Sequence, residues 1–114
     1  MGDEKKAQEE KVFDLVQRTT ELLEISGSVY QNAVVANGDY GGPGSGKPTE
    51  GMIDAEQLLA RGEGILLDPV YSGKGMAGLI DLVRKGHFSK GENVVFIHTG
   101  GSVALFAYRN ILAV

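Results

Sequence analysis

The chain has 114 residues, a formal net charge of −4 and no cysteine, so we expect one domain without disulfides or thiolate metal sites. Lys and Arg are not clustered into a basic stripe, which disfavours nucleic-acid binding. No apolar run approaches the roughly 20 residues of a membrane span, and no apolar signal segment follows the charged N-terminus; we therefore expect a soluble cytoplasmic protein with neither nucleic-acid nor membrane partners.

Residues 1–10 are polar and predict an N-terminal extension, and residues 11–114 predict a single α/β domain. From Lys11, apolar residues recur at helical spacing, which predicts a helix that ends near Ile25. Gly27 is then available for the left-handed position after the helix. Residues 30–36 contain β-branched residues and predict a strand.

Beyond a glycine-rich loop, helices and strands alternate in the pattern. Thr49 is the expected N-cap of a helix that runs to about Arg61 and is ended by Gly62 and Gly64. A short buried strand is expected next, at 65–67. A helix over 74–85, a strand over 93–98 and a final helix starting in 103–108 complete the order. Alternation of this kind is typical of an α/β fold, a parallel sheet flanked by helices.

The glycine loop at 41–49 nearly matches a phosphate-binding P-loop. That motif needs Ser or Thr directly after its lysine, because the hydroxyl ligates magnesium. Here Pro48 follows Lys47, and the threonine comes one residue late. A nucleotide-binding protein with a degenerate P-loop therefore remains only an alternative to a simple loop ahead of a capped helix.

Two corners follow predicted strands, where ligands bind in α/β sheets. The first, 68–74, offers the Tyr71 phenol, the Ser72 hydroxyl and the Lys74 amine. The second, 98–102, places Thr99 before two glycines at a helix start, where backbone N–H groups attract anions. The structural alternative for the first corner is that Tyr71 packs on a sheet edge and Asp68 caps a turn. For the second it is that the two glycines serve turn geometry alone, with His98 a satisfied core histidine. With two histidines far apart in sequence, a metal site is not expected.

Three stretches occur in the order and spacing of one enzyme family: 48–50, 68–81 and 92–108. Together they resemble the C-terminal part of the pyridoxal-phosphate family that contains D-cysteine desulfhydrase, L-cysteate sulfo-lyase and aminocyclopropane-carboxylate deaminase. The likeness runs from about Val12 to Tyr108. It implies a piece of the fold-type-II (tryptophan synthase β-like) fold with pyridoxal 5′-phosphate as cofactor. The family's Schiff-base lysine lies upstream of anything present, so the chain alone is expected to be inactive.

The resemblance also implies roles for individual residues. Tyr71 matches a catalytic tyrosine that assists proton movement, and Ser72, Thr99, Gly100 and Gly101 match cofactor-binding positions. Because the deaminases carry a glutamate where Ser72 stands, the resemblance favours β-elimination of sulfide or sulfite from a cysteine-type amino acid, giving pyruvate and ammonia. Ser45 replaces a second active-site tyrosine of the family.

A different class of function is also consistent with the pattern. A piece of a larger fold exposes apolar surface, and such patches drive association. The chain is therefore either part of a carbon–sulfur lyase acting on a small amino acid, or a non-catalytic α/β association module. On either hypothesis we expect a homo-oligomer.

Overall fold

A computed structural model describes residues 2–112, which form helices joined by long loops. The chain divides into two compact units, Met1–Gly38 and Asp39–Val114. The predicted division into an extension, 1–10, and a domain that corresponds to the enzyme family, 11–114, is a different kind of division and stays a prediction. Met1, Ala113 and Val114 lie outside the described residues. No helix within the described chain is both long enough and apolar enough to cross a bilayer.

The first unit consists of helix α1 (Gly2–Leu22) and the short 3-10 helix η1 (Gln31–Ala33). The polar residues at the N-terminus belong to the same helix as the segment from Lys11, because α1 already begins at Gly2. Further along this helix, Arg18 and Asp14 form an i,i+4 ion pair of 3.1 Å. Glu24, at φ 58°, takes the left-handed position after the helix that was expected at Gly27, and Gly27, at φ 78°, lies in the next turn. The backbone N–H of Ala36 donates to Glu9 Oε1 at 2.9 Å, which ties the end of this unit back to α1.

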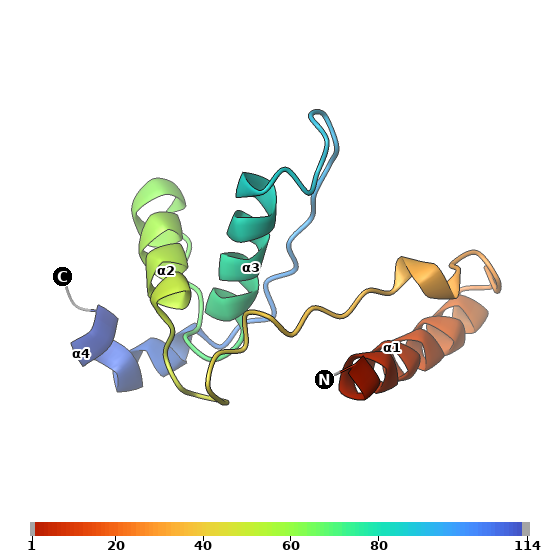
Figure 1. Ribbon diagram of the computed structural model, residues 1–114, viewed down its shortest axis with the longest axis horizontal. Helices are drawn as coiled ribbons and strands as arrows, with labels where there is room; N and C mark the ends of the chain where they lie inside the picture. Colours follow the sequence, from red (N-terminus) through yellow and green to blue (C-terminus); the bar gives the residue numbers. More distant parts are fainter. Residues whose placement is uncertain (1, 113–114) are drawn as a thin grey trace. The chain divides into compact units, whose positions relative to one another are not determined.

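The second unit is built on α2 (Glu50–Glu63) and α3 (Ser72–Arg84), which pack side by side (Figure 1). Thr49 caps α2 by accepting the Met52 N–H at 3.2 Å, and Gly64 ends it in the left-handed conformation at φ 66°. Both features confirm the predicted helix start and its glycine-terminated end.

A small apolar core lies between these helices. Its buried members come from α2, from the segment between the helices and from α3, and half-buried side chains complete it: Ala55, Leu67 and Met76, with Leu59, Ala77, Leu79, Ile80 and Phe96. Met52 is fully buried. Burial of these side chains fixes the first turn of α2 against the first turn of α3, because apolar area removed from water is the main favourable term in folding.

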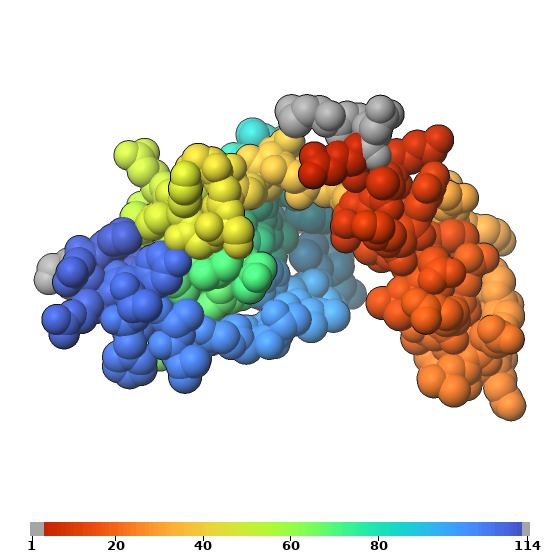
Figure 2. Space-filling model, turned by 90° about the horizontal axis from the view of Figure 1, so that it is seen from below, coloured from red at the N-terminus to blue at the C-terminus, as the bar shows by residue number. Residues whose placement is uncertain are grey.

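The C-terminal part of this unit is a 3-10 helix, η2 (Ser102–Tyr108), followed by the short α4 (Arg109–Leu112). The expected helix start in 103–108 is therefore present in a tighter form. Figure 2 shows this segment, in dark blue, against the yellow glycine loop. The contact includes a hydrogen bond of 2.7 Å from the Tyr108 hydroxyl to the Gly46 carbonyl.

The predicted parallel sheet flanked by helices is wrong for residues 2–112, which contain no strand. The segment 30–36 contains η1, and 65–67 and 93–98 have no regular secondary structure and no ladder hydrogen bonds. A strand requires a neighbour for its backbone N–H and C=O groups. Val95 and Ile97 are about four-fifths exposed, so the apolar pattern has no covering layer here.

Candidate active site

Asp68 organises the first corner. Its Oδ1 accepts the backbone N–H groups of Val70 and Tyr71, at 2.9 and 2.7 Å, and its Oδ2 accepts the N–H of Ser72 at 2.8 Å. The Ser72 hydroxyl donates to the same Oδ2 at 2.6 Å and accepts the Asp68 N–H at 2.7 Å. Asp68 thus does the work of an N-cap for α3, although it precedes the helix by four residues.

The ionisation of Asp68 reflects two opposing effects. Burial alone would raise the pKa of its carboxyl, because it penalises the charged form. The hydrogen bonds from Ser72, Tyr71 and Val70 together outweigh burial, so the pKa of Asp68 is lowered. The corner therefore carries a fixed negative charge at neutral pH.

The two corners lie against each other. A Cβ placed on Gly101 would be 3.2 Å from Cβ and Cγ of Asp68. Two residues before the first corner, the Leu66 carbonyl lies 2.8 Å from His98 Nε2, and the Gly100 N–H donates to His98 Nδ1 at 3.1 Å. With Nδ1 accepting from the Gly100 N–H, Nε2 is the ring nitrogen placed to donate to the Leu66 carbonyl. The chain thus brings 68–74 and 98–101 together from segments about thirty residues apart.

The glycine loop is bound to the same corner by a buried lysine. Lys74 Nζ donates to the carbonyl oxygens of Gly41 and Gly44, at 2.6 and 3.1 Å. A Cβ at Gly42, whose φ is 70°, would lie 2.4 Å from Thr49 Cγ2, so only glycine fits there. Lys74 is therefore a structural clamp and has no free amine for covalent chemistry.

The predicted site residues differ in what they offer to a ligand. Tyr71 is 73% exposed, and Thr99, Gly100 and Gly101 are also exposed. Ser72 is buried, and its hydroxyl is fully used by Asp68. A ligand at the two corners would contact the Tyr71 phenol, Thr99 and the backbone of the two glycines. Ser72 would not contact the ligand and would contribute only by holding the conformation of the first corner.

Sequence reasoning did not single out Glu56, whose side chain is buried in α2. Both carboxyl oxygens lack a hydrogen-bond partner among residues 2–112. Burial, and next the charge of Asp68, raise the pKa of Glu56 to about 7. A signal was present: Glu56 follows Met52 by four residues, on the apolar stripe that also carries Ala55 and Leu59.

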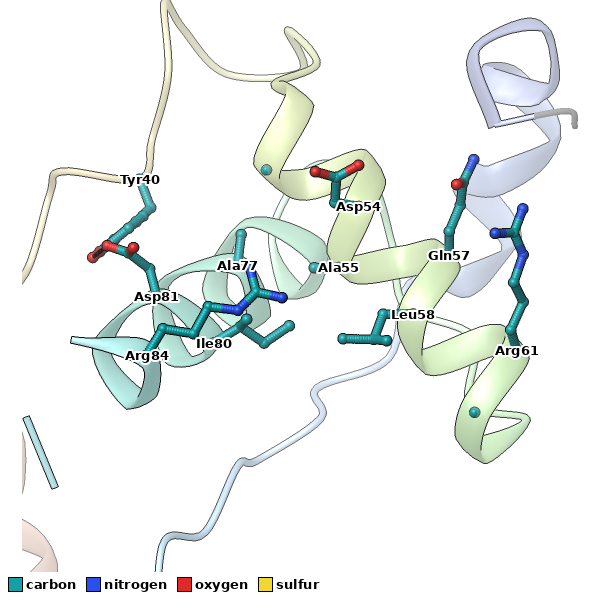
Figure 3. A pocket seen from close by; sticks show the side chains of 12 residues that line it. Tyr40, Asp54, Ala55, Gln57, Leu58, Arg61, Ala77, Ile80, Asp81 and Arg84 are labelled. Atoms are coloured by element: carbon teal, nitrogen blue, oxygen red, sulfur yellow. Dashed lines mark hydrogen bonds between the residues drawn. The ribbon is translucent and has the colours of Figure 1, made fainter. Parts of the chain in front are cut away.

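A groove of about 700 Å³ lies away from both corners, between α2 and α3. Figure 3 shows Tyr40 and Asp81 directed at each other beside the groove, with Arg84 extending from α3. The Tyr40 hydroxyl donates to Asp81 at 2.6 Å, and this bond is the main reason that the pKa of Tyr40 is raised. None of the five predicted site residues lines this groove.

Comparison with known proteins matches residues 1–100 to the family described as "Pyridoxal-phosphate dependent enzyme". A 1-aminocyclopropane-1-carboxylate deaminase of Burkholderia cenocepacia (strain HI2424) is 44% identical over 102 residues, 90% of this chain and 30% of the relative. Deaminases of the same name from Ralstonia pickettii (strain 12J) and Burkholderia multivorans (strain ATCC 17616 / 249) are 44% identical over 101 residues and 43% over 104. They cover 89% and 91% of this chain, and 30% and 31% of the relatives. The chain thus spans less than a third of the length of these curated relatives.

Proposed function

The chain belongs to the pyridoxal-phosphate dependent enzyme family, and we propose that its two corners form one wall of the cofactor site in a carbon–sulfur lyase. The observation that carries this proposal is the contact between Gly101 and Asp68, which joins the Tyr71 corner to the Thr99 corner. The activity proposed is β-elimination of sulfide or sulfite from a cysteine-type amino acid, D-cysteine or L-cysteate, giving pyruvate and ammonia.

The residues present fit one side of a flat pyridine ring. Thr99 offers a neutral hydroxyl, and the backbone of Gly100 and Gly101, at φ 95° and 91°, allows close approach. When bound, pyridoxal phosphate supplies an electron sink for the bond that is broken at the amino acid's Cα. The chain offers no lysine for covalent attachment at this place, because Lys74 is committed to two carbonyls.

Tyr71 is the group that would move a proton. Its phenol is exposed beside a helix start, and Asp68 holds its backbone. Ser72 keeps its hydroxyl on Asp68 and adds no second carboxylate to the corner. A neutral group at this position, where the resemblance implies a glutamate in the deaminases, suits elimination, in which a good leaving group compensates for weaker stabilisation of the negative charge at Cα.

A second candidate is deamination of 1-aminocyclopropane-1-carboxylate. It is favoured by the relatives that carry this name at 43–44% identity. It is disfavoured by Ser72, since the resemblance implies a glutamate at this position in the deaminases. The two candidates release different carbon products and can be separated by assay.

The test is a hybrid enzyme, in which this chain replaces the matching 102 residues of the Burkholderia cenocepacia deaminase. We expect the hybrid to bind pyridoxal phosphate and to release pyruvate from D-cysteine or L-cysteate. Tyr71→Phe should lower the rate by about 10²-fold or more, the usual contribution of a positioned proton donor or acceptor. Tyr40→Phe makes the same chemical change outside the corners and should leave the rate unchanged.

Two results would reject the proposal. A hybrid that holds the cofactor but releases ammonia only from 1-aminocyclopropane-1-carboxylate would assign the second candidate. Equal rates for Tyr71→Phe and the parent hybrid would remove Tyr71 from proton transfer. The absorbance of bound pyridoxal phosphate shows whether the hybrid enzyme has folded and taken up its cofactor, so either result can be told apart from a hybrid that does not fold.

A further inference from the structure

The carboxyl group of Glu56 is packed against the backbone of the first corner. The residue is 5% exposed, and neither of its carboxyl oxygens is open to solvent. A Cβ placed on Gly73 would be 2.8 Å from Glu56 Oε1 and 2.8 Å from the Asp68 carbonyl oxygen. That carbonyl accepts the Gly73 N–H at 2.8 Å. The carboxyl therefore lies beside the point at which Asp68 is bonded to the first turn of α3.

The surroundings of this carboxyl favour its neutral form. Neither oxygen has a hydrogen-bond partner among residues 2–112, and a buried charge without a partner costs far more than a buried neutral group. The oxygen on the other side of Gly73, the Asp68 carbonyl, is an acceptor, so only a protonated carboxyl brings a donor to this place. Burial, and next the charge of Asp68, accordingly raise the pKa of Glu56 to about 7.

Three charged side chains belong to the elements around Glu56, and none of them compensates its ionisation. Asp68, in the loop before α3, carries the same sign of charge. Lys74 of α3 is bound to two backbone carbonyls of the glycine loop. Arg109 of α4 borders a cavity that Glu56 also lines. Within the described chain neither cation forms an ion pair with Glu56, so its ionised form would be buried near a like charge.

We propose that Glu56 is a positioning residue for the first corner: its protonated carboxyl packs against the corner and supports it, and loss of the proton to water releases it. The ionised carboxylate moves toward solvent, and the space that it leaves beside Gly73 loosens the hydrogen bonds between the corner and Asp68. These bonds include the one that holds the Tyr71 backbone. The change in conformation requires no ligand, whereas its effect on a reacting group rests on the role proposed for Tyr71.

Hydrogen exchange of the 114-residue chain, followed by mass spectrometry from about pH 5 to about pH 8, tests this coupling. The four backbone N–H groups of 70–73 all donate to Asp68 and report on the corner. Because the pKa of Glu56 is raised from 4.5 to about 7 only while the corner is closed, rising pH favours the open form. After correction for intrinsic exchange, protection in 70–73 should fall by about tenfold or more between pH 5 and pH 7 and level off above. Protection in 79–84, at the other end of α3, should fall much less.

Two variants remove the titrating group in different ways. Glu56→Gln keeps the shape of the neutral carboxyl, and Glu56→Leu replaces it with an apolar side chain that needs no partner. Both should keep 70–73 protected across the pH range. Glu63→Gln makes the first change on the exposed surface of α2 and should retain the pH dependence of the parent chain. In the parent chain itself, the carboxyl ¹³C resonance of Glu56 should titrate together with the loss of protection.

Three results would overturn the proposal. The first is a Glu56 resonance that titrates in the ordinary carboxyl range. The second is an equal loss of protection in 70–73 and 79–84, because that would be unfolding of the whole unit. The third is a pH dependence that persists in both Glu56→Gln and Glu56→Leu. None of these measurements uses cofactor or turnover, so they leave the lyase proposal untouched, and an inactive hybrid enzyme would leave the coupling of Glu56 to the corner untouched.

Discussion

Asp68 shows how one side chain orders a whole corner of the chain. A single carboxylate accepts three backbone N–H groups and one hydroxyl, and it lies at the positive end of α3. The loop is therefore set before any ligand arrives. Because those hydrogen bonds lower the pKa of Asp68 against the opposing effect of burial, its contribution to stability is present above the ordinary carboxyl range and is lost as the pH falls through it.

Asp68→Asn should destabilise the second unit by about 2–4 kcal/mol, since the amide leaves one acceptor for four donors and places an NH₂ against backbone N–H groups. Urea unfolding followed by circular dichroism measures the change. Asp54→Asn, at an exposed position on α2, should shift the midpoint little. Equal shifts in the two variants would contradict the role of Asp68.

Glu56 gives the opposite dependence on pH. Its pKa rises from 4.5 to about 7 on folding, so the folded chain binds a proton more tightly than the unfolded chain does. Stability should therefore fall as the pH rises between these values, by up to about 3 kcal/mol, and level off above them. In Glu56→Gln this fall should disappear from urea midpoints measured across the same range, whereas Glu63→Gln should retain it.

At the scale of the elements, the approach of α3 to α2 depends on a residue without a side chain. Gly73 lies in the first turn of α3, where a Cβ would be 2.8 Å from the Asp68 carbonyl oxygen and 2.9 Å from Met52 Cγ. Backbone cannot yield as a flexible side chain can. The same contact that packs the helices also supports the corner.

Gly73→Ala should therefore destabilise the chain by about 1–3 kcal/mol, the usual range for overpacking a filled site. Gly62→Ala is the matched substitution in α2, where no atom lies within 4 Å of the new Cβ. It should stabilise the chain by about 0.5–1 kcal/mol through helix propensity. Thermal unfolding compares the two, and a stabilising Gly73→Ala would show that the helices do not pack as described.

At the scale of the whole molecule, apolar side chains exceed what the small core covers. Val95, Ile97, Phe106 and Val103 are each more than three-quarters exposed. Patches of this kind mark association surfaces. The relatives are about three times as long as the matched region.

We expect the chain to self-associate through the extended segment 93–98. The combined change Val95→Lys and Ile97→Lys should reduce the mass measured by light scattering, because charge opposes the pairing of exposed strand-like backbone. Adding the same two charges on α1, as Gln8→Lys and Gln17→Lys, should leave the mass unchanged. A monomer at high concentration in the parent chain would contradict the prediction.

The sequence by itself determined the main helices and singled out two corners that the structure brings together. Thr49 and Gly64 set the ends of α2 through local hydrogen bonding and a positive φ, and the order of motifs identified the family before any coordinates. The sequence did not determine whether a sheet forms. The apolar runs at 65–67 and 93–98 can become strands only where neighbouring strands accept and donate their backbone hydrogen bonds, and no such neighbours are present among residues 2–112. Likewise only the tertiary structure decided that Ser72 turns inward to Asp68, that Lys74 is a clamp, and that Glu56 is buried without a partner, because each depends on contacts between segments far apart in the chain.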